Sequence, residues 1–210
     1  MIEHKTLNTV VHNAFRRTLD RFDQALVAFP AGSQQRADEL ARAWDFFAHE
    51  VHDHHHYEEE FFWPALEQTD ADLSSVAELD SEHDAMRDAL ESASTLMAQL
   101  HAEPTAPHAA AARNGVDTLR AVLVGHLEHE ERDLEPISAH YADSKPMKAA
   151  LGQVKKAHLT KMGNFVEWLQ DGATEADKAG LRREIPGPVV AVFGTLAGRR
   201  YRKDIAPVWR

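Results

Sequence analysis

The chain carries one pattern of histidines, glutamates and a proline twice, once in each half. A lone histidine is followed by the segment HxxxEExxxxP, and the internal distances are nearly the same in both halves. The first copy comprises His12, His54, Glu58, Glu59 and Pro64, and the second His83, His126, Glu130, Glu131 and Pro136. A fold needs repeated apolar positions, but it has no structural use for repeated imidazoles and carboxylates unless something binds them. The duplication therefore constrains the chain to a fold in which both halves supply one binding site.

Composition limits the chemistry of that site. The 210 residues include no cysteine, which excludes thiolate zinc sites, iron–sulfur clusters and cysteine nucleophiles, so nitrogen and oxygen must hold any metal. The net charge is −11, yet residues 181–210 carry seven basic and two acidic side chains, a local charge of +5. The remainder then carries −16, which argues against nucleic acid as a partner of the main body.

No targeting feature stands out. The amino terminus, MIEHK, lacks the apolar stretch of a secretory signal, and no run approaches eighteen apolar residues. We therefore expect a cytoplasmic protein without a transmembrane segment.

The long segments favour helices, because Ala, Leu, Glu, Gln and Arg fill them while valine and isoleucine are scattered. Helices are predicted over residues 2–29, 33–64, 72–101, 107–141 and 144–170. Four long helices with short connections pack best as an up-down-up-down four-helix bundle, which makes the fold class all-α. We assign residues 1–142 to this bundle with a two-metal site, and residues 143–210 to an additional helix and a basic C-terminal tail that pack on it.

Six polar residues of the duplicated pattern lie on the apolar stripes of the four predicted helices. They are His12, His54, Glu58, His83, His126 and Glu130. Burying a carboxylate without a partner costs on the order of several kcal/mol, and a buried imidazole also needs partners for its nitrogens. Six such groups in one bundle therefore call for a cation. In each HxxxE pair the imidazole and the carboxylate lie one helical turn apart on one face. The sequence therefore predicts that these six residues bind metal.

Other histidines lie close to the predicted ligands. His52, His55 and His56 crowd the second helix, and His55 with Glu59 repeats the HxxxE spacing, but it lies about 100° around the helix from His54. The second half has Leu127 and Glu131 at the equivalent positions, so only the pair of His54 and Glu58 is duplicated with both ligand types. We expect His52, His55, His56 and His129 to be supporting or exposed groups, and His158 to be a core histidine. Whether His55, His129 or His158 adds a ligand stays open.

The motif H…HxxxE…H…HxxxE on four helices resembles the hemerythrin-like (HHE cation-binding) family, over roughly residues 7–140. The resemblance implies a non-heme centre of two iron ions with an oxo or hydroxo bridge. Four histidines (His12, His54, His83 and His126) would be terminal ligands, and Glu58 and Glu130 would bridge the irons.

One position departs from the oxygen-carrying members, which place a second histidine one turn after the third-helix ligand. That position is Arg87 in this chain. Two irons offer about twelve positions, of which the four histidines, two bridging carboxylates and the oxo or hydroxo bridge fill ten. Two open positions favour small-molecule chemistry over plain oxygen carriage, unless one of the three remaining histidines fills the gap.

The expected function is the binding and redox processing of hydrogen peroxide, nitric oxide or oxygen in stress defence, with an electron donor that the sequence does not identify. A catalase-like or nitric oxide-reducing oxidoreductase is one form of this. A non-catalytic oxygen, nitric oxide or iron sensor, carrier or store is the alternative, and a structural zinc or manganese site is a third.

Several neighbours are candidates to support the centre. Asp53, Glu59, Asp84 and Glu131 are expected to orient the histidines, Tyr57 or Tyr141 to donate to a bound oxygen species, and Arg16 and Arg87 to pair with Glu131 or Glu59. The basic tail is expected to lie across the acidic bundle, with an acidic electron donor or a membrane surface as its alternative partners.

Overall fold

A computed structural model describes residues 6–74, 76–158, 162–185 and 197–210 of the chain, apart from the side chain of His158. Regular structure in these ranges is helical, and they contain no strand. The helices are α1 (Leu7–Val27), α2 (Gln34–Tyr57), α3 (Trp63–Leu66), α4 (Val76–Ala102), α5 (Ala106–Asp133), α6 (Glu135–Tyr141), α7 (Lys145–His158), α8 (Met162–Gln170) and α9 (Glu175–Glu184). The chain also forms two π-helical turns, η1 (Glu58–Phe62) and η3 (Tyr201–Ile205), and the 3₁₀ turn η4 (Ala206–Trp209).

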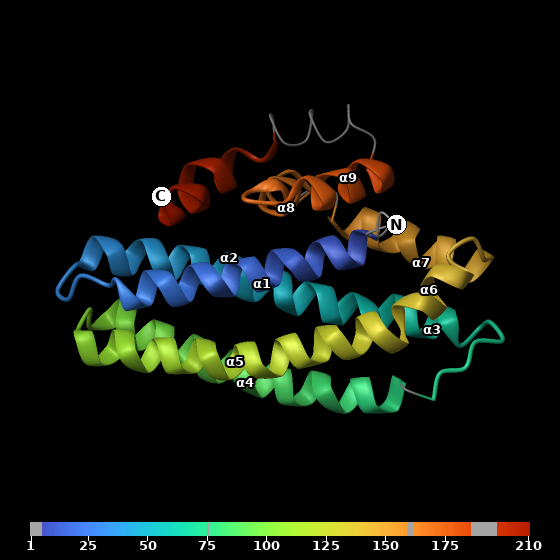
Figure 1. Cartoon of the computed structure of the whole chain (residues 1–210), viewed down its shortest axis with the longest axis horizontal. Coiled ribbons are helices and arrows are strands. Elements are labelled where there is room, and N and C mark those ends of the chain that lie inside the picture. The colour runs from blue at the N-terminus through green and yellow to red at the C-terminus, as the bar shows by residue number, and fades with distance from the viewer. Residues whose placement is uncertain (1–5, 75, 159–161, 186–196) are drawn as a thin grey trace.

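The long helices α1, α2, α4 and α5 lie side by side, and consecutive ones run in opposite directions (Figure 1). Short connections join α1 to α2 and α4 to α5 at one end of the bundle, and the connection from α3 to α4 lies at the other end. Helix α1 packs beside α5, and α2 packs beside α4. This arrangement confirms the predicted all-α bundle.

Side-chain caps set the beginnings of three bundle helices. The hydroxyls of Thr6, Ser33 and Thr105 each accept a hydrogen bond from the backbone N–H three residues later, at 3.1, 3.2 and 3.3 Å. A hydroxyl at this position satisfies one of the N–H groups that a helix leaves unpaired at its start. Helix α1 therefore begins at Leu7, and the earlier start predicted near residue 2 falls outside the described residues.

The ranges 33–64 and 107–141 are helical as predicted, and each carries a local distortion ahead of the proline of its motif. Helix α2 passes into the wider turn η1 at Glu58 and resumes as α3, while α5 ends at Asp133 and the chain resumes as α6 after Leu134. Pro64 and Pro136 lie in the first turns of these continuing helices. Proline has no N–H to donate four residues back, so the turn before it must widen or break. Each distortion begins at or just after a candidate ligand carboxylate.

The C-terminal helices and turns cover α1 and α2 rather than extending away from them (Figure 1). Trp168 of α8 is buried, its ring centre lies 5.2 Å from that of Phe15 on α1, and its indole N–H donates to the Thr18 hydroxyl at 3.0 Å. Tyr201 and Ile205 of η3 join the same apolar core. The chain thus continues the bundle core beyond residue 142, and the division at 142/143 stays a prediction.

The basic tail makes contacts within the molecule. Its buried residues Tyr201, Ile205 and Val208 face the core, while Arg202 pairs with Glu167 of α8 at 3.0 Å. Helix α8 and its flanking turn therefore supply part of the acidic surface against which the tail lies. The predicted segment 186–193 of the tail lies outside the described residues.

Trp168→Ala should lower the free energy of unfolding by about 3–5 kcal/mol, because it removes a buried aromatic ring from between α8 and α1. Urea denaturation followed by circular dichroism measures this change. Val27→Ala is the control, since Val27 is 64% exposed and should change stability by less than about 0.5 kcal/mol. Equal effects of the two substitutions would show that the C-terminal layer does not stabilise the bundle.

Candidate metal centre

Four buried or nearly buried histidines meet in pairs inside the bundle, one from each long helix. The Nε2 atoms of His12 on α1 and His54 on α2 lie 3.1 Å apart. Those of His83 on α4 and His126 on α5 lie 3.2 Å apart. The structure thus brings together the four histidines that the duplicated motif singled out.

Glutamates outside the pairs fix the orientation of three of these rings. The Nδ1 of His12 lies 2.8 Å from Glu131, the Nδ1 of His83 lies 2.7 Å from Glu59, and the Nδ1 of His126 lies 3.0 Å from Glu82. A carboxylate only accepts hydrogen bonds, so each Nδ1 carries the proton and donates it. In the neutral rings of His83 and His126 the Nε2 then carries a lone pair that points into the bundle, as in metal-binding histidines.

The protonation of the two pairs differs. Burial lowers the pKa of both His83 and His126, so both rings are neutral and their Nε2 lone pairs face each other at 3.2 Å. Burial also lowers the pKa of His12, but hydrogen bonds with Glu130 and Glu131 outweigh it and raise the value to about 9. Burial and the charge of His12 lower the pKa of His54 to about 3. The pair of His12 and His54 can therefore hold a proton. The pair of His83 and His126 has no donor between its nitrogens and suits a metal cation.

Two buried carboxylates lie between the histidine pairs. The Oε1 of Glu58 is 3.1 Å from the Nε2 of His54, and its Oε2 is 3.7 Å from the Nε2 of His83, so this side chain spans both pairs. Glu130 reaches His12 with its Oε2 at 3.3 Å. The Oε2 of Glu58 is buried without a hydrogen-bond partner. Oxygens left unpaired at such depth are costly in the protein alone and are natural ligands for a cation.

The two carboxylates also influence each other. Burial and the charge of Glu130 raise the pKa of Glu58 well above its ordinary value. Burial raises the pKa of Glu130 too, but the hydrogen bond and positive charge of His12 reverse this and bring the value to about 2. One carboxyl is therefore neutralised by a proton and the other by an imidazolium, which are the charges that metal ions would replace.

The donor atoms form two groups that could each hold an ion, and Glu58 belongs to both. One group comprises His12, His54, Glu58 and Glu130, and the other His55, Glu58, His83 and His126. All six residues predicted from the duplication are present in these groups. The structure adds His55, which sequence reasoning placed outside because the second half has Leu127 there. His54 and His55 both face the interior, His54 beside His12 and His55 beside His83 and His126.

The remaining candidates from the sequence are distributed as follows. Glu59 and Glu131 orient histidines as predicted, and each accepts a hydrogen bond from the arginine one turn after that histidine, Arg87 at 2.7 Å and Arg16 at 2.8 Å. Glu82, which the sequence analysis missed, bonds both His126 and His129. It immediately precedes His83, and only the helical register places it opposite α5.

Asp84 binds Arg87, and Asp53 pairs with His49 at 3.3 Å. Tyr141 donates to Asp70 at 2.9 Å, and Tyr57 bonds Asp53, and the expected donation from one of these tyrosines to a bound oxygen species stays a prediction. Each hydroxyl is hydrogen-bonded to a neighbouring carboxylate.

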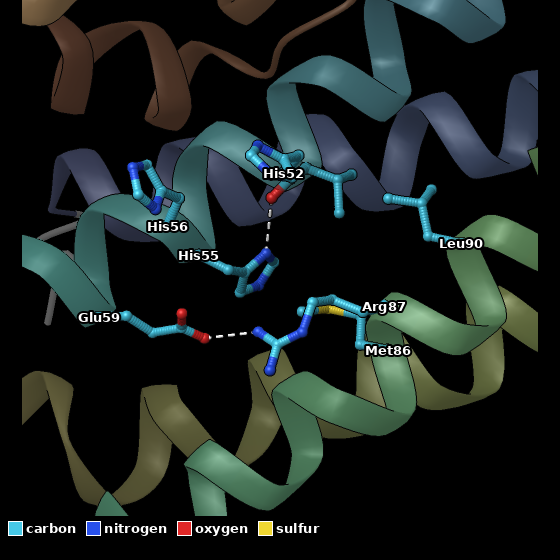
Figure 2. Close-up of a pocket in the computed structure, with 8 residues that line it drawn as sticks. His52, His55, His56, Glu59, Met86, Arg87 and Leu90 are labelled. Carbon is cyan, nitrogen blue, oxygen red and sulfur yellow. Dashed lines mark hydrogen bonds and ion pairs between the residues drawn. The ribbon is translucent and has the colours of Figure 1, made fainter.

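A cavity of about 280 Å³ opens between α2 and α4 beside the second group (Figure 2). His55 projects into its centre from α2, and the ion pair of Glu59 with Arg87 borders it from below. His52 and His56 lie at its rim, and Val51, Met86 and Leu90 supply apolar walls. The cavity could hold several molecules the size of water, each of about 30 Å³.

The fold and this constellation define a helical bundle that carries a buried histidine–carboxylate site suited to cations. The chain belongs to the hemerythrin family: the family model described as hemerythrin HHE cation binding domain matches residues 9–138. No curated protein and no solved structure matched the chain. Among the described helices, none has the length and apolar character needed to cross a membrane.

Glu131→Gln should weaken metal binding by about 10–100-fold, because the amide holds the His12 ring less firmly and removes a charge that strengthens it as a ligand. Competition with a chromophoric chelator for Co²⁺ measures the affinity. Glu60→Gln is the control, since Glu60 pairs with His56 on the surface and touches none of the inward histidines. Unchanged affinity in Glu131→Gln would show that this carboxylate does not support a metal ligand.

Proposed function

We propose that the site binds two iron ions joined by an oxo or hydroxo bridge. His12 and His54 would hold one ion, His83 and His126 the other, and Glu58 and Glu130 would bridge them. The facing Nε2 atoms of His83 and His126, 3.2 Å apart with their Nδ1 protons committed to carboxylates, are the observation that carries the proposal. A donor set of imidazole and carboxylate without thiolate suits iron, and the chain belongs to a family named for cation binding.

The proposed activity is the redox processing of a small molecule, namely hydrogen peroxide, nitric oxide or oxygen, with electrons exchanged with an unidentified donor. Two adjacent irons would supply or accept two electrons in such a reaction. The chain's own residues support it by keeping the centre dry and small. Phe15 packs against the His54 ring, and Trp63 stacks on the His83 ring with centres 4.8 Å apart, so the interior excludes bulky substrates.

The cavity between α2 and α4 supports access for a small ligand. Its walls include Glu59, which binds His83, and His55, whose ring centre lies 4.8 Å from that of His83. Arg87 and the rim histidines give its opening polar character. A ligand that reaches this cavity is one side chain away from the proposed centre.

A non-catalytic sensor, carrier or store is the second candidate, and one contact favours it. The Phe15 ring lies between His54, at 5.4 Å, and Trp168 of the C-terminal layer, at 5.2 Å. A change at His54 would therefore reach α8 through a single packed ring. Such a contact is what a ligand-dependent shift of the C-terminal layer needs.

Anaerobic reduction of the iron-loaded protein, followed by exposure to peroxide, oxygen or nitric oxide, tests the function. Consumption of the added molecule with many turnovers per centre is the expected result. A stable adduct without turnover would favour the carrier or sensor. Absence of any spectral response would contradict both and leave a structural metal site.

Removal of one predicted ligand should remove iron. His126→Leu should lower the iron content from two ions per chain by at least one, because it deletes an Nε2 donor at a buried position. Plasma emission spectrometry on freshly purified protein measures the content. His101→Ala, a change at an exposed histidine that pairs with Asp38, should retain both ions. Full iron content in His126→Leu would contradict the assignment of this ligand.

A further inference from the structure

His55 is buried in a way that the duplicated motif does not explain. Only 4% of the residue is exposed, and its Nδ1 lies 2.7 Å from the backbone carbonyl oxygen of Val51. A carbonyl oxygen only accepts, so the proton lies on Nδ1 and the Nε2 carries a lone pair. That Nε2 is buried and has no hydrogen-bond partner. An oriented ring with a free inward lone pair has the form of a metal ligand.

The free nitrogen belongs to one half of the centre. The ring centre of His55 lies 4.8 Å from that of His83 and 5.1 Å from that of His126. One donor atom from each of these three histidines and from Glu58 falls within 4.8 Å of the others. Ligands of a single ion are spaced in this way, because each lies about 2.0–2.2 Å from the metal.

We propose that His55 is a fifth histidine ligand, bound through Nε2 to the ion that His83 and His126 hold. The proposal rests on the proposed two-metal centre and makes it unequal, with three histidines on one ion and two, His12 and His54, on the other. Of the about twelve coordination positions on the two ions, His55 raises the number that are filled from ten to eleven. The remaining open position then lies on the ion of His12 and His54.

The other half of the chain has no equivalent ligand. Leu127 takes the place of His55 there, and it is completely buried in the apolar core. Since α2 and α5 are related by the duplication, leucine is a side chain that this position of the bundle accommodates. The unequal number of histidine ligands on the two ions therefore follows from the difference between His55 and Leu127.

His129 provides the contrast among the buried histidines. Its Nδ1 lies 2.8 Å from Glu82 and its Nε2 lies 3.2 Å from Asp133, so both nitrogens have protein partners. Both nitrogens therefore point to acidic side chains rather than to the other inward histidines. The side chain of His158 lies outside the described part of the chain, and the proposal does not involve it.

Proton NMR of the Co²⁺-loaded protein counts the ligands directly. A histidine bound through Nε2 keeps an exchangeable Nδ1 proton, which the paramagnetic ion shifts out of the main spectrum. Five such resonances are expected in the wild type: one each from His12, His54, His55, His83 and His126. In His55→Leu four should remain, and the affinity for one of the two Co²⁺ ions should fall by more than about tenfold.

His52→Leu is the matched control, because it places leucine at the exposed rim of the same cavity on the same helix. It should keep all five resonances and both affinities. Two bound ions with only four shifted resonances in the wild type, or an unchanged count and affinity in His55→Leu, would overturn the role of His55 and leave the redox proposal standing. Five resonances in the Co²⁺-loaded protein, together with an iron-loaded protein that does not react with peroxide, oxygen or nitric oxide, would have the opposite meaning: His55 is a ligand, and the proposed function fails.

Discussion

The arrangement of the bundle interior depends on the need to neutralise donor atoms that point at one another. Imidazole Nε2 atoms and carboxylate oxygens converge there: the neutral rings of His83 and His126 face each other without a donor between them, and the charge of Glu130 acts on Glu58. Without a cation the only remedies are a proton on Glu58 and an imidazolium at His12. These are weak substitutes, because each removes one repulsion and leaves the Oε2 of Glu58 and the Nε2 of His55 buried without a partner. A pair of metal ions would satisfy all of these groups together.

The two consecutive glutamates of each motif have different roles, and helical geometry sets which is which. The first glutamate, Glu58 or Glu130, points into the bundle, and the second lies about 100° further round and reaches the neighbouring helix. Glu59 of the first copy thus holds His83 of the second copy, and Glu131 of the second holds His12 of the first. The two halves therefore orient each other's histidines. The turns that widen or break before Pro64 and Pro136 begin beside these glutamates.

Much of this could be predicted from the sequence, because duplication and helical period both act locally along the chain. The four long helices, the six inward residues and the pairing of Arg16 with Glu131 and Arg87 with Glu59 all followed from spacing. Glu82 was missed because its role depends on α4 lying against α5, which spacing within one helix does not specify. His55 was set aside because symmetry with Leu127 argued against it. Two adjacent residues of α2 can both face inward when helices lie on either side of them, and only the packed bundle shows that.

X-ray absorption spectroscopy at the iron edge tests the central claim most directly. The proposed centre predicts that only nitrogen and oxygen atoms bind each iron and that a second iron lies within about 4 Å of the first iron. Iron without a neighbouring iron at that distance, or iron bound in the same way after the inward histidines are replaced, would contradict it.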